Sequence, residues 1–370
     1  MMKYLFCFLW IALFTSSCED AVDEIAPSEV TNASLYFPPV QSDEWENVTP
    51  EELGWETEKI PDLLQFLEQN NTRAFLLLKN GKIALEYYGG KTLAGQDFSN
   101  NSNWYWASAG KTLTAFLVGI AQEEGYLDIN HPSSDYLGEG WTSLSTAQEA
   151  AIKVSNQLSM NTGLDEGVTN KDCTDKDCLQ FLTTPNSRWA YHNAAYTLLD
   201  GVVEGATQQD FDTYFNTKIA NPIGMTGFWQ YIDYNHVFFS NARSMARFGL
   251  LILNKGKWQD LPILSDEKYY EAMVNTSQTL NESYGYLWWL NGKNSYMLPG
   301  LQTKFTGSIS PDAPQDMVAA VGKNGQLLCI VQSQNLVLIR MGDLPTDGGL
   351  VPISFQNLLW QEVNKVMDVE

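Results

Sequence analysis

Histidine, cysteine and basic residues are scarce in this chain, and each shortage argues against a class of function. The 370 residues include only 3 His and 5 Cys, so we expect no metal site and no cofactor. Lys and Arg total 22 against 44 Asp and Glu, and the net charge of −22 disfavours nucleic acid and anionic lipid as partners. The chain also lacks Gly-x-Ser-x-Gly, which surrounds the nucleophile of many Ser-His-Asp hydrolases.

The amino terminus has no apolar run long enough to cross a bilayer. The eleven apolar residues 4–14 follow Lys3, which is the pattern of a signal peptide rather than of a membrane span. We therefore expect a signal peptide over residues 1–17 and export of the protein.

The signal peptide is followed by a candidate lipid anchor. The sequence Thr15-Ser16-Ser17-Cys18 resembles the lipobox of bacterial lipoproteins, with ordinary cleavage near Ser17 as the alternative. We expect a lipidated Cys18, then a flexible tether over 18–45 that has few large apolar residues. The protein would then be a lipoprotein of the periplasm or the outer membrane, attached to the membrane only by this anchor.

Three cysteines remain in the expected mature domain. Cys173 and Cys178 are five residues apart, and a local disulfide is the expected pairing outside the cytoplasm. Cys329 lies in an apolar stretch and is expected to be a buried free thiol. Calcium binding stays open near the cysteine pair, although the order of the acids differs from an EF-hand: Asp172, Asp175 and Asp177.

Residues 46–370 are expected to form one domain of the α+β class. Asn80-Gly81 between two apolar runs predicts a β-hairpin near the start of this domain. An antiparallel sheet is expected from both chain ends (about 46–110 and 290–370), flanked by helices and interrupted by a helical subdomain (about 111–289). Strands are expected over 74–78, 83–88, 316–321, 327–332 and 336–341, and helices over 61–69, 112–122, 152–160, 194–204, 211–219, 242–253, 265–274 and 355–367.

Ser108 and Lys111 form the first candidate catalytic motif. Three residues separate them at the start of an apolar helical pattern, so the two side chains would share one face of the first turn. The helix N-terminus adds unpaired N–H groups to a nucleophile and a base. A second Ser-x-x-Lys, Ser265 to Lys268, is expected instead to cap a helix, with Ser265 as the N-cap.

Two further motifs follow in the chain. Tyr191-His192-Asn193 precedes a helix, where the Tyr191 hydroxyl can project into a cleft, whereas the second Tyr-x-Asn (214–216) lies within an amphipathic helix. Lys323-Asn324-Gly325 lies between two late strands. A simple hairpin turn explains Lys79-Asn80-Gly81 and remains an alternative at Lys323.

The three motifs together resemble those of the serine β-lactamase and penicillin-binding-protein superfamily. The resemblance is closest to the branch of class C β-lactamases, D-Ala-D-Ala peptidases, related esterases and 6-aminohexanoate-oligomer hydrolases. It implies a β-lactamase/transpeptidase-like fold. The resemblance extends over residues 50–345. Other similar stretches lie at 152–164, 244–249, 284–289 and 322–326.

The resemblance also implies a role for each motif residue. Ser108 would be the acylated nucleophile, and Lys111, oriented by Asn193, its general base. Tyr191, kept partly ionic by Lys111 and Lys323, would relay protons to the leaving group and later to water. Burial near Tyr191 and Lys323 would lower the pKa of Lys111 to about 7.

The oxyanion and substrate sites follow from the same resemblance. The backbone amides of Ser108 and Gln326 would hold the oxyanion. Asn324, Gly325 and Trp189 would contact substrate, with Trp189 in an aromatic-walled cleft. Because β-lactamases usually have Thr where Asn324 lies, we expect an esterase or amidase with weak or absent β-lactamase activity.

Three functional alternatives stay open at this stage. A D-Ala-D-Ala carboxypeptidase and a β-lactamase share the same chemistry on a small ester, amide or peptide substrate. A receptor that is acylated without turnover would use the same fold. A Ser-His-Asp hydrolase is disfavoured, because solvated or structural roles suffice for His131 and for His236, which is expected in a loop.

Overall fold

The computed structural model describes residues 35–346 and 352–369. The expected signal peptide and Cys18 lie outside these ranges. Within the described residues, no helix combines the length and the apolar character needed to cross a membrane.

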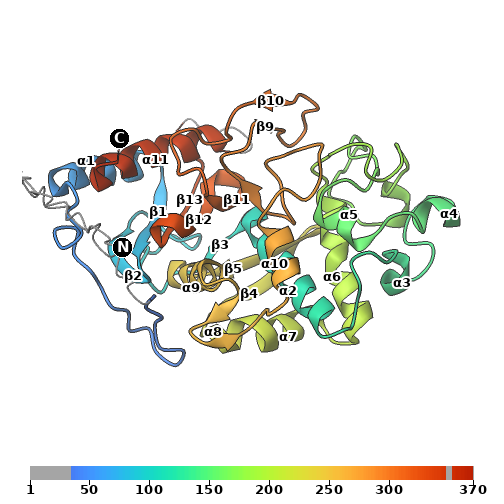
Figure 1. Cartoon of the computed structure of the whole chain (residues 1–370), viewed down its shortest axis with the longest axis horizontal. Coiled ribbons are helices and arrows are strands. Elements are labelled where there is room, and N and C mark those ends of the chain that lie inside the picture. Colours follow the sequence, from blue (N-terminus) through green and yellow to red (C-terminus); the bar gives the residue numbers. More distant parts are fainter. Residues whose placement is uncertain (1–34, 347–351, 370) are drawn as a thin grey trace, which may run out of the picture. The chain divides into compact units, whose positions relative to one another are not determined.

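A six-stranded antiparallel sheet joins the two ends of the domain (Figure 1). The hairpin between the first two strands turns at Asn80 and Gly81, which both have positive φ, as Asn-Gly predicts. The last three long strands are apolar and buried because helices cover both faces of the sheet. The strand order is β2 (Lys82–Tyr88), β1 (Thr72–Lys79), β13 (Leu336–Gly342), β12 (Gln326–Val331), β11 (Val318–Gly322) and β8 (Trp289–Leu290).

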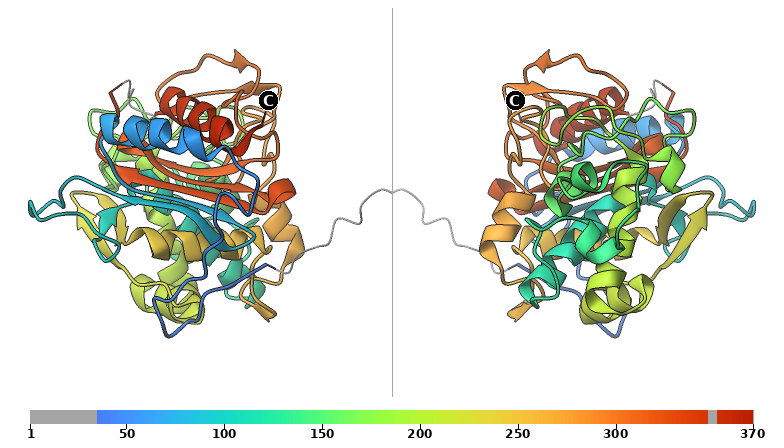
Figure 2. Two further views of the ribbon diagram at one scale, coloured as in Figure 1. Left: turned by 90° about the vertical axis from the view of Figure 1, so that its left-hand side faces the viewer. Right: turned by 90° about the vertical axis from the view of Figure 1, so that its right-hand side faces the viewer.

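Helices from distant parts of the sequence cover the two faces of this sheet. Helices α1 (Ile60–Gln69) and α11 (Ile353–Met367) pack side by side on one face, as Figure 2 shows. Helix α9 (Ala242–Leu253) packs on the opposite face against β13, β12 and β1. The sheet and these helices form an α+β core, as the sequence predicted.

Helices are the main regular elements in the middle of the chain. Helix α2 (Lys111–Glu123) is buried over nearly its whole length and packs against α6 (Asn193–Thr207) and α10 (Glu267–Met273). The predicted helix 152–160 is limited to α5, and the predicted helix 211–219 changes to a π-helix after one turn. The remaining elements are α3 (Ser134–Leu137), α4 (Thr146–Glu149), α5 (Val154–Leu158), α7 (Phe211–Phe215), a π-helix (Asn216–Ala220) and α8 (Asn221–Ile223).

A second, three-stranded sheet was not predicted from the sequence. Its order is β3 (Trp104–Tyr105), β5 (Asn235–Ser240) and β4 (Phe228–Ile232), and a tight turn with Asp233 at positive φ joins β4 to β5. The expectation of a loop at His236 is wrong, because this residue pairs with Tyr231 in the β4–β5 ladder. Two short strand pairs complete the fold, β6 (Lys257–Trp258) with β7 (Leu261–Pro262) and β9 (Ser295–Tyr296) with β10 (Phe305–Thr306).

Candidate active site

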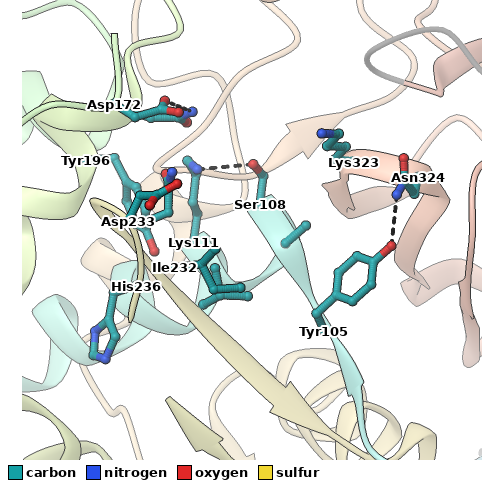
Figure 3. A pocket seen from close by; sticks show the side chains of 14 residues that line it. Tyr105, Ser108, Lys111, Asp172, Tyr196, Ile232, Asp233, His236, Lys323 and Asn324 are labelled. Atoms are coloured by element: carbon teal, nitrogen blue, oxygen red, sulfur yellow. Dashed lines mark hydrogen bonds between the residues drawn. The ribbon is translucent and has the colours of Figure 1, made fainter. Parts of the chain in front are cut away.

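Ser108 lies in a short 3₁₀ turn (Ala107–Gly110) that leads directly into α2. Lys111 is the first residue of the helix, and its Nζ lies 3.2 Å from the Ser108 hydroxyl, to which it donates a hydrogen bond (Figure 3). Ala107 has a positive φ of 47°, which is costly for a residue with a Cβ. The predicted side-by-side arrangement of Ser108 and Lys111 is therefore present, with a strained residue just before the serine.

Lys111 lies in an apolar, aromatic environment. Its side chain is buried, and its Nζ lies 4.1 Å from the ring centre of Tyr196 and 5.3 Å from that of Tyr191. Burial lowers the pKa of Lys111 to about 7, while the carboxylates of Asp172 and Asp200 oppose this shift. The pKa shift has the expected size, and its main cause is desolvation.

Tyr191 faces the Ser108 hydroxyl, but its charge differs from the partly ionic state that was expected. It stacks on Trp289, with ring centres 6.1 Å apart, and packs edge-on against Tyr284. Burial raises the pKa of Tyr191 well above its ordinary value, and a hydrogen bond with Ser108 opposes this shift to a smaller extent. The expectation of a partly ionic Tyr191 is therefore wrong, because desolvation favours the neutral phenol.

Asn193 begins α6 beside the site, but it does not hold Lys111. Its Nδ2 donates a 2.7 Å hydrogen bond to Asp172, and its Oδ1 has no partner among the described residues. The expectation that Asn193 orients Lys111 is therefore wrong. Asn193 instead fixes Asp172, a carboxylate that sequence reasoning assigned only to a possible calcium site.

Two cavities flank Ser108, and both are also lined by Asp172, Asn193 and Lys323. One has a volume of about 390 Å³ and extends toward β4 and β5. The other has a volume of about 520 Å³ and extends past Tyr191 and Trp289. The serine thus lies between two spaces that can hold the two halves of a small substrate. Other residues that line the first are Tyr105, Tyr196, Ile232, Asp233, His236 and Asn324 (Figure 3), and others that line the second are Glu166, Lys171, Pro299, Gly300 and Val321.

The end of β11 forms the sheet side of the site. A Cβ on Gly322 would lie 2.4 Å from the Trp106 carbonyl oxygen, so only glycine allows the strand to approach the Ser108 turn this closely. Gly322 and Lys323 both line the second cavity. This part of the sheet, rather than the predicted Gly325 and Gln326, faces the nucleophile.

Gly325 and Gln326 are directed away from both cavities. Asn324 has a φ of 64°, which turns the chain between β11 and β12. The Gln326 side chain donates to the Gly342 carbonyl, and the buried Arg340 donates to the carbonyl oxygens of Asn324 and Gly325. Gln326 and Gly325 therefore stabilise the turn. Arg340 lies in β13, between β1 and β12 of the sheet.

Trp189 is also not a substrate contact. Its side chain is 1% exposed and lines neither cavity beside Ser108. It packs against Tyr191, Tyr284 and Trp289, with ring centres 6.4, 5.4 and 6.1 Å away. The expectation of direct binding is wrong, because Trp189 is buried and does not reach either cavity. Its ring packs against Tyr191 and Trp289, which do line the second cavity.

Cys173 and Cys178 form a disulfide in the loop that follows Asp172, as the sequence predicted. Cys329 is a buried free thiol, as expected. The nearby acids do not converge on one point, because Asp172 accepts from Asn193 and Asp175 accepts from the Tyr234 hydroxyl. Among the described residues, no group of three or more His, Cys, Asp or Glu is arranged to hold a metal ion.

The remaining candidates from the sequence lie apart from the nucleophile or have other partners. The second Ser-x-x-Lys is exposed, and Asp266, rather than Ser265, caps its helix. Both ring nitrogens of His236 face carboxylates, Nδ1 at 2.9 Å from Asp200 and Nε2 at 3.5 Å from Asp212. His236 is therefore not available as a base for a Ser-His-Asp arrangement at Ser108, although it lines a cavity there.

Comparisons with known proteins agree with this geometry. The sequence profile of the family named Beta-lactamase matches residues 65–347. The 6-aminohexanoate-dimer hydrolase of Paenarthrobacter ureafaciens is 25% identical over 330 residues, which cover 78% of this chain and 76% of that protein.

Solved structures share the fold at low sequence identity. A protein from Bacillus anthracis assigned as a 6-aminohexanoate-dimer hydrolase aligns with a TM-score of 0.63 and 17% identity, over 89% of each chain. A penicillin-binding protein from Bacillus halodurans aligns with a TM-score of 0.57 and 16% identity, over 77% of this chain and 96% of that one. The profile match covers most of the chain, and the fold agrees with it. The chain therefore belongs to the beta-lactamase family and is a serine hydrolase.

Proposed function

We propose that this protein hydrolyses small esters or amides through an acyl-enzyme on Ser108, with Lys111 as the general base. The observation that supports this most strongly is the 3.2 Å contact between Lys111 Nζ and Ser108 Oγ in a buried environment. Burial lowers the pKa of Lys111 to about 7, so a large fraction of the amine is neutral at neutral pH. The ordinary pKa of about 10.4 would leave almost none.

Acylation follows from this pair. Neutral Lys111 takes the proton of Ser108 while the serine oxygen attacks the substrate carbonyl. The developing oxyanion accepts a hydrogen bond from the Ser108 amide at the start of the helical turn. The backbone amide of Lys323, at the cavity end of β11, replaces that of Gln326 as the candidate second donor.

Tyr191 is the proposed proton relay. As a neutral phenol in the same cavity as Ser108, it can give its proton to the leaving group and recover one from the Lys111 ammonium. In deacylation the same steps run in reverse, with water in place of the leaving group. A separate glutamate is not needed as the general base for deacylation, the second half of the cycle.

The substrate side of the site favours esters and amides over β-lactams. Asn324 replaces the usual Thr, and its Nδ2 already donates a 2.8 Å hydrogen bond to the Tyr105 hydroxyl. This amide is therefore engaged before any substrate carboxylate arrives. Asp172 and Asp233 line the first cavity and oppose the approach of an anion there, whereas Glu166 in the second cavity is paired with Arg188.

The expected result is a higher kcat/KM for p-nitrophenyl butyrate than for nitrocefin on the same enzyme preparation. Adding the linear 6-aminohexanoate dimer to the panel tests amide hydrolysis, because a 25% identical relative is named for that substrate. The Ser108→Ala variant provides the blank. A kcat/KM for nitrocefin above about 10⁴ M⁻¹s⁻¹ together with a lower value for the ester would make the protein a β-lactamase instead.

The site of action is part of the same proposal. The apolar residues 4–14 and the Cys18 lipobox support export and a lipid anchor, and the Cys173–Cys178 pair fits an oxidising compartment. We propose a lipoprotein of the periplasm or outer membrane whose substrate is a small molecule of that compartment.

A further inference from the structure

A buried carboxylate–imidazole pair lies near Lys111, the proposed general base. Asp200 on α6 and His236 on β5 are 3% and 8% exposed. Asp200 Oδ2 lies 2.9 Å from His236 Nδ1, and Asp200 Oδ1 has no partner among the described residues. His236 is enclosed by the rings of Tyr231 and Trp229, at 4.2 and 4.9 Å between ring centres. The pair is unlike the exposed ion pairs of the surface and has no part in the mechanism above.

Helix α6 connects this pair to Lys111. Tyr196 and Asp200 are four residues apart on the helix and therefore share one face. The Tyr196 ring centre lies 4.1 Å from Lys111 Nζ, and His236 lines the same cavity as Lys111 and Tyr196 (Figure 3). Asp200 thus lies on the same face of α6 as Tyr196, and its carboxylate favours the charged form of Lys111.

We propose that Asp200 and His236 are positioning residues for the general base, because the charge of this pair raises the pH at which Lys111 loses its proton. This inference rests on the proposed role of Lys111. An ionised Asp200 stabilises the Lys111 ammonium, whereas a protonated Asp200 does not. Burial raises the pKa of Asp200 to about 6, and the hydrogen bond with His236 opposes this shift, so that Asp200 stays mostly ionised at neutral pH.

Other charged groups face Lys111, and none is both as buried and as well enclosed as Asp200. Asp172 opposes the lowering of the pKa of Lys111 more strongly than Asp200 does, but it is partly exposed and accepts a hydrogen bond from Asn193. Asp233 and Lys323 line the cavity mouth and are exposed to solvent, which screens them.

The groups around the pair itself are also more exposed than Asp200. Glu204 on α6 and Asp212 on α7 disfavour a second negative charge at Asp200. Asp210, the N-cap residue of α7, and Asp212 interact with His236. Tyr231 on β4 stacks on the imidazole. Asp212 is the useful comparison, because its carboxylate lies 3.5 Å from His236 but its side chain is 43% exposed.

The rate of Ser108 labelling should rise with pH as Lys111 loses its proton, and this rise is the acid limb of the profile. In Asp200→Asn the midpoint of the acid limb is expected to lie about half to one pH unit lower than in the wild-type protein. The reason is that the Lys111 ammonium loses its buried counter-charge and gives up its proton more readily. His236→Phe is expected to shift the limb in the same direction, because Asp200 without its partner takes up a proton. The double variant should show no more shift than Asp200→Asn alone.

The measurement is the rate constant for labelling of Ser108 by a fluorophosphonate between pH 5 and 10, followed by intact mass. Asp212→Asn is the matched control and should move the limb by less than about 0.2 unit, because its charge is screened. Circular dichroism of each variant verifies its fold, and His236→Phe tests the idea alone if Asp200→Asn does not fold. An unshifted limb in the folded variants, or an equal shift in Asp212→Asn, would overturn this inference, whereas an unlabelled wild-type protein would refute the proposed function as well.

Discussion

Replacing Ser108 by alanine is expected to reduce kcat for every substrate of this protein by about 10⁴-fold or more. The serine oxygen is the only proposed nucleophile, and its loss leaves just the binding and oxyanion contacts of the site. The substitution removes a hydroxyl that accepts from Lys111 at 3.2 Å, and it should leave the fold intact. The measurement is hydrolysis of p-nitrophenyl butyrate, with circular dichroism to confirm folding.

Ser265→Ala is the matched control for this experiment. Ser265 belongs to the second Ser-x-x-Lys of the chain, and it is exposed and lines neither cavity beside Ser108. Its replacement should leave kcat within about twofold, because surface substitutions of this kind rarely disturb a protein. A dead Ser265 variant beside an active Ser108 variant would show that the wrong motif has been assigned.

Replacing Lys111 by methionine is expected to lower kcat/KM by about 10³-fold and to remove the acid limb of the pH profile. In the wild-type protein burial lowers the pKa of Lys111 to about 7, so the amine is protonated and inactive below this pH and neutral above it. Activity should therefore rise with pH through about 7. Methionine fills a similar volume in the aromatic environment without a titrating group.

Lys268→Met provides the control for the lysine, since Lys268 is the exposed partner of Ser265. Its kcat/KM and its acid limb should equal those of the wild-type protein. The account of the base would be contradicted by a wild-type profile that is flat through pH 7. It would also be contradicted by a limb that persists in a folded and active Lys111→Met variant.

Much of the fold can be predicted from local patterns in the sequence. Asn80-Gly81 specifies its hairpin because both residues tolerate positive φ, and the apolar pattern of 242–253 matches α9 residue for residue. Ser108 and Lys111 are only three residues apart, so the geometry of one helical turn brings them together. Such features need no knowledge of the rest of the chain.

The predictions that were wrong concern residues whose positions depend on contacts between distant segments. His236 lies in a segment rich in aromatic and polar residues, and only the partnership with Asp200 explains why it is buried in a strand. Asn193 was assigned to Lys111, yet the loop that contains the disulfide brings Asp172 closer to it.

The prediction for the sheet side of the site was wrong for a similar reason. Lys323-Asn324-Gly325 has the spacing of a known motif, but the positive φ of Asn324 turns Gly325 and Gln326 away. Gly322 is the residue that touches the nucleophile turn, through a close approach to the Trp106 carbonyl that no local pattern encodes. Short motifs therefore predicted the contact between Ser108 and Lys111, whereas the surroundings of this pair required the tertiary structure.

The most direct test of the central claim is to find the residue that becomes acylated. The protein is mixed with a fluorophosphonate, a penicillin and a p-nitrophenyl ester in turn, and intact mass with peptide mapping locates any adduct. We expect a single fluorophosphonate adduct on the peptide that contains Ser108, and none in the Ser108→Ala variant. A stable adduct on another residue, or substrate turnover by a protein in which Ser108 is never modified, would contradict the account.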